Sequence, residues 1–143
     1  MHSFTVTESA LEIASLREQL LSHDAGAYAS FEGWVRANND GRAVAALTYE
    51  SYRLLAETEG CRIVEQAKLR FAILDAACVH RVGTLELGEL AVWVGVSAGH
   101  RDAAFAACRW IIDEVKSRVP IWKHEHYADG PAAWLHPPPA DSR

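Results

Sequence analysis

The sequence predicts a mixed α+β domain built around an antiparallel or mixed β-sheet. Two observations indicate this class. Stretches that alternate polar and apolar residues with a period of two are interleaved with stretches whose apolar residues recur at helical spacing, and the chain has no internal repeat. A chain of 143 residues is long enough to bury a core as one domain. We expect this domain to span residues 1–136, and we expect residues 137–143 to form a flexible tail because the proline-rich end is typical of loose segments.

The N-terminal third predicts a strand, a helix and a second strand. Residues 4–7 (FTVT) are typical of a short strand, and residues 8–23 of a helix. In residues 26–36 (GAYASFEGWVR), small or apolar residues alternate with larger or polar ones, which indicates a strand that carries Arg36 on its more polar face. Residues 37–42 (ANNDGR) are rich in Asn, Asp and Gly, so a turn or loop should follow.

The remaining two thirds predict three further strands and two longer helices. Residues 43–52 favour a strand, residues 73–89 a strand that turns at Gly83, and residues 90–97 a largely buried strand. Apolar side chains at helical spacing mark the buried stripe of each helix. The first stripe consists of Cys61, Val64, Ala67 and Phe71. The second helix spans residues 101–118, and its stripe consists of Phe105, Cys108, Ile112 and Val115.

Composition and charge exclude several classes of protein. The net charge of −5 and the pI of 5.8 are unlike the basic surface of a general nucleic-acid binder, although a local basic pocket is compatible with them. Cys61, Cys78 and Cys108 are odd in number and form no CxxC pair, so we expect reduced thiols in a cytoplasmic protein. No apolar run approaches the length of a membrane span, and the N-terminus is unlike a secretory signal.

The tripeptide HEH at residues 124–126 suggests a metal site, because His124 and His126 share one face of an extended segment. A catalytic zinc site normally has three protein ligands, and the HExxH motif is absent, so we expect no metal. A metal-dependent hydrolase that uses these two histidines remains an alternative. For Cys61 and Cys108 we expect core packing rather than a nucleophilic role, because both lie on apolar helix stripes.

The segment SAGHRDAAF at residues 97–105 is compatible with an anion-binding site at the start of a helix. With Ser97 or Gly99 as the cap, His100 and Arg101 fall in the first helical turn, where the positive end of the helix dipole disfavours cations. Free backbone amides and a guanidinium together form a cradle for phosphate. A pair of tolerated surface residues explains the same pattern equally well.

Two lysines flank Pro120, which ends the second long helix. Lys116 lies eleven residues, about three turns, from Phe105, so it projects close to the apolar stripe. Partial burial would lower its pKa towards values useful for proton transfer. Lys123 shares its extended face with Glu125, its expected ion partner. The alternative is a snorkelling Lys116 and a solvated Lys123.

Four segments occur in an order that resembles one known family. They are FEGWVR (31–36), HRVGTLELGE (80–89), VGVSAGHRDAAF (94–105) and VKSRVPIWKHE (115–125). Together they are similar to the large, catalytic subunit of molybdopterin synthase, from about residue 26 to Trp134. The resemblance implies an α/β hammerhead-type fold with a small additional β subdomain. It also implies a homodimer that binds two copies of a small ubiquitin-like sulfur carrier, which makes a heterotetramer.

The reaction that the resemblance implies is the transfer of two sulfurs onto cyclic pyranopterin monophosphate, which forms the dithiolene of molybdopterin in molybdenum cofactor biosynthesis. The sulfur arrives as a thiocarboxylate on the C-terminal Gly-Gly tail of the carrier, and no resident cofactor is implied. Lys116 and Lys123 match the catalytic lysines, and they also belong to the substrate-binding set. The substrate-binding set that the resemblance implies also contains Trp34, Val35, Arg36, His100, Arg101, His124 and Glu125, of which Trp34 and His124 occupy positions that vary in the family.

The second long helix sets a distance between two groups of cations. Arg101 and Lys116 are 15 residues apart, or about 22 Å along a helix. A pterin is too small to touch both, so we expect a composite site in which His100 and Arg101 come from the second copy of the dimer. A non-catalytic docking module for the carrier, which would tolerate loss of Lys116 and Arg36, is the second hypothesis.

Overall fold

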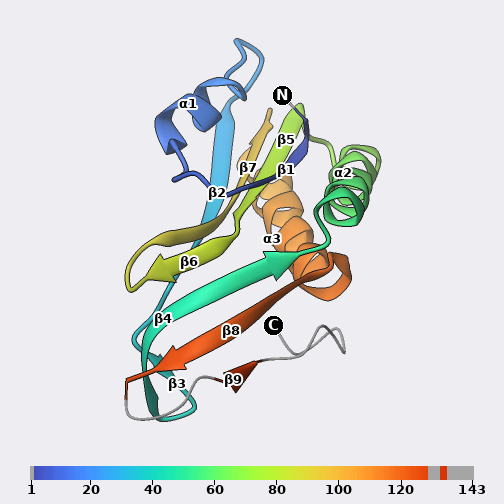
Figure 1. Cartoon of the computed structure of the whole chain (residues 1–143). Helices are drawn as coiled ribbons and strands as arrows, with labels where there is room; N and C mark the ends of the chain where they lie inside the picture. The colour runs from blue at the N-terminus through green and yellow to red at the C-terminus, as the bar shows by residue number, and fades with distance from the viewer. Residues whose placement is uncertain (1, 129–132, 135–143) are drawn as a thin grey trace.

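The computed structural model describes residues 2–128 and 133–134, and within them two β-sheets and three helices (Figure 1). The first sheet has the strand order β1-β5-β7-β2. Its strands are β1 (Phe4–Thr7), β5 (Asp75–Arg81), β7 (Leu90–Ala98) and β2 (Ala27–Trp34). β1 runs parallel to β5 and the other pairs are antiparallel, which confirms the predicted mixed sheet.

The second sheet is centred on β4 (Arg42–Ser51), and Figure 1 shows β4 and β8 side by side below the first sheet. The antiparallel partners of β4 are β3 (Asn38–Asn39), β6 (Gly83–Glu86) and β8 (Ile121–Tyr127), and β9 (Ala133–Trp134) pairs with β8. β6 follows β5 after one residue, so this segment crosses from the first sheet to the second. Gly83 makes the step with a φ of 96°, which favours glycine and confirms the predicted turn.

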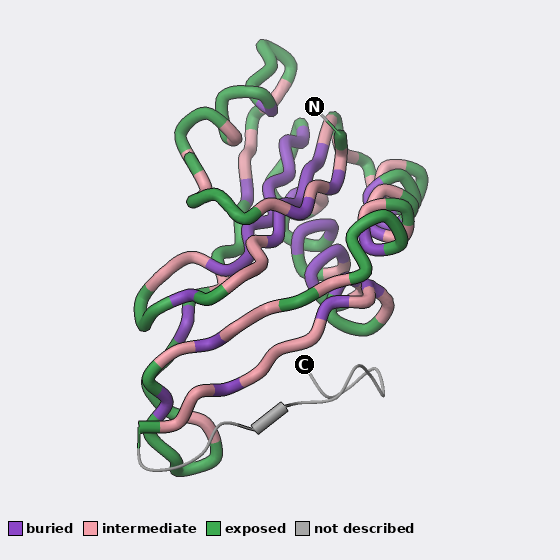
Figure 2. The backbone as a smooth tube through the Cα atoms, in the orientation of Figure 1, coloured by how far each residue is buried: buried purple, intermediate pink, exposed green. Residues whose placement is uncertain are grey.

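Two long helices cover one face of the first sheet (Figure 1). α2 (Arg53–Arg70) packs small and branched residues against β1 and β5, and α3 (Arg101–Arg118) packs them against β2 and β7. The short helix α1 (Ile13–Glu18) lies on the opposite face, where Leu20, Val79 and Trp93 belong to a smaller cluster. Figure 2 shows that buried residues follow the strands of the first sheet and the inner sides of both long helices. The main core therefore sits between this sheet, α2 and α3.

Most of the predicted elements are confirmed, and α3 has the predicted bounds. The first helix is wrong in length, because α1 spans six residues instead of the predicted 8–23. It has no side-chain cap and buries none of its own residues, so little holds a longer helix in place. The predicted loop 37–42 contains the short strand β3, and Asp40 and Gly41 form its turn with positive φ.

The stripe predicted for α3 is wrong at Phe105, whose side chain is 65% exposed. The buried residues of the helix are Ala104, Ala107, Cys108, Ile111, Ile112 and Val115. This stripe is centred on the line through Ala104 and Ile111, so Phe105 lies about 100° around the helix and points to solvent. In α2 the predicted stripe is confirmed at Val64 and Ala67, whereas Cys61 and Phe71 are only partly buried.

The remaining predictions concern the C-terminal tail, the number of domains and the absence of a membrane span. The tail predicted for residues 137–143 lies outside the described residues, and the single domain over residues 1–136 stays a prediction. In the part of the chain that the structure describes, no helix is long and apolar enough to cross a membrane.

Candidate active site

A cavity of about 580 Å³ lies where the two sheets meet the C-terminal end of α3. Its walls come from β2, β5 and β7 of the first sheet, from β4 and β8 of the second, and from the segment that follows β2. The last turns of α3 contribute Ile112, Val115 and Lys116. A cavity of this volume accommodates a small-molecule ligand.

Three cationic side chains from separate segments line this cavity: Arg36, Lys116 and Lys123. Arg36 follows β2, Lys116 lies in the last turn of α3, and Lys123 lies in β8. α3 ends at Arg118, its C-cap residue Val119 is extended, and Pro120 cannot continue a helix, so the chain returns along the second sheet as β8. This reversal places the two lysines on walls of the same cavity.

The burial expected for Lys116 is not present, because the residue is exposed. The expectation depended on Phe105, which points to solvent, although Ile112 and Val115 line the cavity beside Lys116. The structure therefore does not support a role in which burial makes Lys116 a neutral base. The position favours an electrostatic role for the ammonium group.

Glu125 is the buried acid of the cavity, with 2% of its surface exposed. Its Oε1 accepts a hydrogen bond from Asn39 Nδ2 at 2.7 Å and another from the Tyr127 hydroxyl at 2.9 Å. The expected ion pair with Lys123 is wrong, because within the described residues Glu125 takes these two neutral partners instead. Lys123 lies opposite Tyr49 in the β4–β8 ladder.

Tyr49 and His80 also line the cavity, and neither was selected from the sequence. Their rings meet edge to face, with centroids 4.9 Å apart. Burial, and then the nearby Glu125 carboxylate, raises the pKa of Tyr49 to about 12, so its hydroxyl stays protonated at neutral pH. His80 Nδ1 lies 2.8 Å from the carbonyl oxygen of Arg81, which can only accept, so this nitrogen carries a hydrogen.

His80 was overlooked because the segment HRVG resembles an ordinary strand end with a turn. The structure confirms that turn, yet the strand ends against the second sheet and so reaches the cavity. Tyr49 was overlooked because it occupies an unremarkable position in the middle of a strand. No local sequence signal reports the meeting of two sheets, which is a tertiary feature.

His100 and Arg101 do not line the cavity, because they lie at the opposite end of α3. His100 is the N-cap residue without a side-chain cap hydrogen bond, Arg101 is the first helical residue, and both are exposed. The expected caps are wrong: Ser97 is a buried residue of β7, and Gly99 precedes the N-cap. Within one chain, the structure does not bring this pair to the other three cations.

The remaining residues of the implied substrate-binding set divide into those that line the cavity and those that do not. Trp34 lines the cavity and is 66% exposed, so it can contact a ligand. The side chain of Val35 packs with Val44 in a separate core cluster and is not part of the lining. His124 is also outside the lining, and its ring lies 4.7 Å from that of His126 on the same face of β8.

The cysteines and histidines offer little for covalent or metal chemistry. Burial raises the pKa of the Cys78 thiol, and it raises that of Cys108 to about 11, so neither is a ready nucleophile. In the described residues, no group of three or more His, Cys, Asp or Glu side chains is placed to hold a metal.

The fold and the cavity together define the class of protein. It is a two-sheet α+β domain with a small-molecule site, and the arginine and lysine side chains that line this site suit anionic ligands. Comparison with known proteins gives the family. The family described as MoaE protein matches residues 6–118. The chain belongs to the MoaE family, which confirms the resemblance found in the sequence.

The relatives carry a consistent name. A molybdopterin synthase catalytic subunit from Thermoplasma volcanium is 43% identical over 129 residues, which are 90% of this chain and 94% of the relative. One from Pyrococcus abyssi is 50% identical over 109 residues, 76% of this chain and 74% of the relative. A crystal structure of molybdopterin synthase from Staphylococcus aureus superposes with a TM-score of 0.89 at 31% identity, covering 95% of this chain and 98% of that one. These relatives confirm the predicted fold class and make the chain an enzyme subunit.

Proposed function

We propose that the cavity is the place where sulfur is transferred from the thiocarboxylate of a small carrier protein to cyclic pyranopterin monophosphate. The observation that carries this proposal is the meeting of Arg36, Lys116 and Lys123 in one cavity from three separate segments. The relatives are named molybdopterin synthase, the reaction is the one that the family resemblance implies, and the cavity supplies a chemical reason for it.

The reaction brings together two anions that repel each other. The substrate carries a cyclic phosphate and the carrier tail ends in a thiocarboxylate. Two like charges 4 Å apart repel by about 4 kcal/mol at an effective dielectric constant of about 20. Arg36, Lys116 and Lys123 offset this repulsion, and the guanidinium of Arg36 suits forked contact with phosphate oxygens.

Each lysine has a distinct task in this proposal. Lys116 holds the carrier terminus, and Lys123 stabilises the charge that develops as sulfur forms a bond to a carbon of the pterin substrate. The bond from that carbon to oxygen breaks in the same exchange, and the oxygen leaves as water or as the opened phosphate ester. The bond between sulfur and the carrier's carbonyl carbon is then cleaved by water, which returns the carrier as a carboxylate. Trp34 lies at the cavity and contacts the pterin, while Glu125 keeps Asn39 in the wall.

His100 and Arg101 reach such a site only from another copy of the chain. In one copy they are about 22 Å from Lys116 along α3, farther than a pterin extends. We therefore propose a homodimer with composite sites, flanked by two carrier subunits in the cytoplasm. A chain of the same fold from Helicobacter pylori, at a TM-score of 0.75 and 20% identity over 92% of this chain and 89% of that one, was solved as a complex of two subunits of molybdopterin-converting factor.

The direct test is incubation of the purified protein with thiocarboxylated carrier and the cyclic pterin, with detection of the dithiolene product. We expect product from the wild type, and a loss of about 100-fold or more in rate for Lys116→Ala. Binding of the carrier without any product would favour the second hypothesis, a docking module, in which the Lys116→Ala and Arg36→Ala variants behave like the wild type.

The alternative of a metal-dependent hydrolase has its own test. It requires a metal held by His124 and His126, whose rings lie together on β8. Metal analysis of the purified protein decides it: one equivalent of bound zinc that is lost in a His124→Ala variant would support the hydrolase. Our proposal expects no stoichiometric metal.

A further inference from the structure

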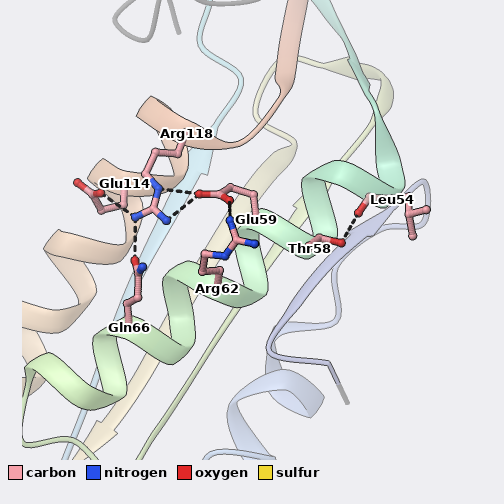
Figure 3. A network of polar contacts seen from close by, with 7 residues as sticks. All are labelled: Leu54, Thr58, Glu59, Arg62, Gln66, Glu114 and Arg118. Carbon is pink, nitrogen blue, oxygen red and sulfur yellow. Dashed lines mark hydrogen bonds and ion pairs between the residues drawn. The ribbon is translucent and has the colours of Figure 1, made fainter.

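An ion-pair network joins the end of α3 to α2, and Arg118 is at its centre (Figure 3). Arg118 is the last residue of α3. Its Nε and one terminal nitrogen contact Glu59 Oε2 at 2.8 and 2.7 Å, and its other terminal nitrogen donates to Gln66 Oε1 at 2.8 Å and to Glu114 Oε1 at 3.1 Å. The remaining Glu59 oxygen accepts from Arg62 at 2.7 Å. One guanidinium thus contacts three acceptors on two helices.

This network is more than a pair of surface charges. The side chain of Arg118 is 26% exposed and that of Glu59 is 22% exposed, so both are largely shielded from water. A planar guanidinium with a fixed fork of donors holds its acceptors in one relative orientation. The network therefore restricts both the distance between the helices and the rotation of the last turn of α3 about its axis.

The rotation matters because Lys116 is two residues before Arg118. Successive helical residues are about 100° apart, so the two side chains leave the helix about 200° apart, on opposite sides. Arg118 faces α2, as Figure 3 shows, and Lys116 lines the cavity. A change in the rotation of this turn would move Lys116 along the cavity wall.

The ion-pair network of Arg118 also lies just before Lys123 in the chain. After Arg118 the chain continues through Val119 and Ile121, which are buried at 0% and 2% exposure, directly into β8. Tyr52 donates its backbone N–H to the carbonyl of Pro120 at 3.3 Å, which ties this connection to the start of α2. Only four residues thus separate Arg118 from Lys123 in the chain.

We infer that Arg118 is a positioning residue that sets the placement of Lys116 and Lys123 in the cavity. It touches no ligand itself, and its kinetic consequences rest on the function proposed above. The motif VKSRVPIWK contains all three residues, and only its two lysines were selected from the sequence as site residues.

Arg118→Ala is the informative variant, and Arg109→Ala is its matched control. Arg109 lies on the same helix and pairs with Asp113 at 3.0 Å, but the two side chains are 81% and 56% exposed and belong to one helix. We expect Arg118→Ala to lower kcat for dithiolene formation by about 10- to 100-fold, because a misplacement of about 1 Å can have that effect. KM for the cyclic pterin should change less than about three-fold, since the anion-binding charges remain.

A conservative variant and a structural readout complete the design. Arg118→Lys should recover only part of kcat, because a single ammonium cannot reach Glu59 and Gln66 in the same fixed geometry. Amide hydrogen exchange should accelerate in residues 115–123 of Arg118→Ala and remain unchanged in β2 and β7. The Arg109→Ala control should match the wild type in both measurements.

Several results would overturn the inference. One is a folded Arg118→Ala protein with wild-type kcat. A second is faster exchange over the whole chain with a parallel loss of folded protein, which would indicate general stability instead of positioning. If the wild type forms no dithiolene, the proposed function fails. The hydrogen-exchange experiment still tests whether Arg118 holds residues 115–123 in place. Unchanged protection of these residues in Arg118→Ala would contradict that role.

Discussion

Tyr49 stands opposite Lys123 in the β4–β8 ladder, and its ring contacts His80 at the end of β5. Because burial and the Glu125 carboxylate keep its phenol protonated, Tyr49 adds no negative charge beside the lysine. Glu125, the buried carboxylate of the cavity, accepts hydrogen bonds from Asn39 and Tyr127. At the scale of the residue, the cavity combines cationic side chains with a buried carboxylate that has neutral hydrogen-bond partners and a phenol that stays protonated.

The raised pKa of Tyr49 predicts a specific loss of stability at high pH. The pKa is about 12 in the folded protein against 10.0 in the unfolded chain. The contribution of this group is therefore complete below pH 10 and is lost as the pH rises from 10 to 12. We expect the free energy of unfolding to fall over this window by roughly 2 kcal/mol more in the wild type than in Tyr49→Phe. Equilibrium denaturation at pH 9 to 12 measures it, and identical pH profiles for the two proteins would refute the burial of this phenol.

The three cysteines should differ in reactivity. We expect an aromatic disulfide reagent at pH 8 to label Cys61 in the native protein and to leave Cys78 and Cys108 unmodified, because both latter thiols are buried with raised pKa values. Mass spectrometry after digestion identifies the labelled site, and all three thiols should react in denaturant. Rapid native labelling of Cys78 would show that the core between β5 and the helices opens readily.

At the scale of the element, the packing of α2 on β1 depends on a glycine. Gly60 lies in the middle of α2, and a Cβ there would overlap the fully buried ring of Phe4. Alanine is normally favoured over glycine in a helix by about 1 kcal/mol. The close approach of the helix to the strand reverses that preference.

Gly60→Ala is therefore expected to destabilise the protein by about 1–3 kcal/mol, the usual range for overpacking a core. Ser117→Ala, at an exposed position of α3, should change stability by less than about 0.5 kcal/mol. Chemical denaturation of both variants measures the difference. A more stable Gly60→Ala protein would mean that α2 does not approach β1 this closely.

Elements with a strong local pattern were predictable, and those defined by tertiary contacts were not. α3 has the expected bounds because a long apolar stripe and a proline define it, yet Phe105 was placed in the core because spacing alone does not fix the centre of a stripe. The first helix was predicted too long, because its residues are acceptable in a helix but few contacts hold them there.

At the scale of the whole molecule, the candidate site exists only where the sheets and α3 meet. Arg36, Lys116 and Lys123 were selected from the sequence through motifs, and the fold places them around one cavity. Tyr49 and His80 could not be found in the same way, since their part in the cavity depends on the crossing of β5 into β6. The separation of Arg101 from Lys116 was predictable, because helix length follows from residue count.

The central claim is that cations from separate segments, and from two copies of the chain, meet at one site for two anions. Complementation tests it: Arg101→Ala and Lys116→Ala chains are co-expressed with different tags, and dithiolene formation by the mixed dimers is measured. Each variant alone should be nearly inactive, and a random mixture should recover about a quarter of wild-type activity, because half of the dimers carry one intact composite site. A mixture of Lys116→Ala and Lys123→Ala should recover none, since both lysines line the cavity of one chain. Absence of recovery in the first mixture would contradict the account.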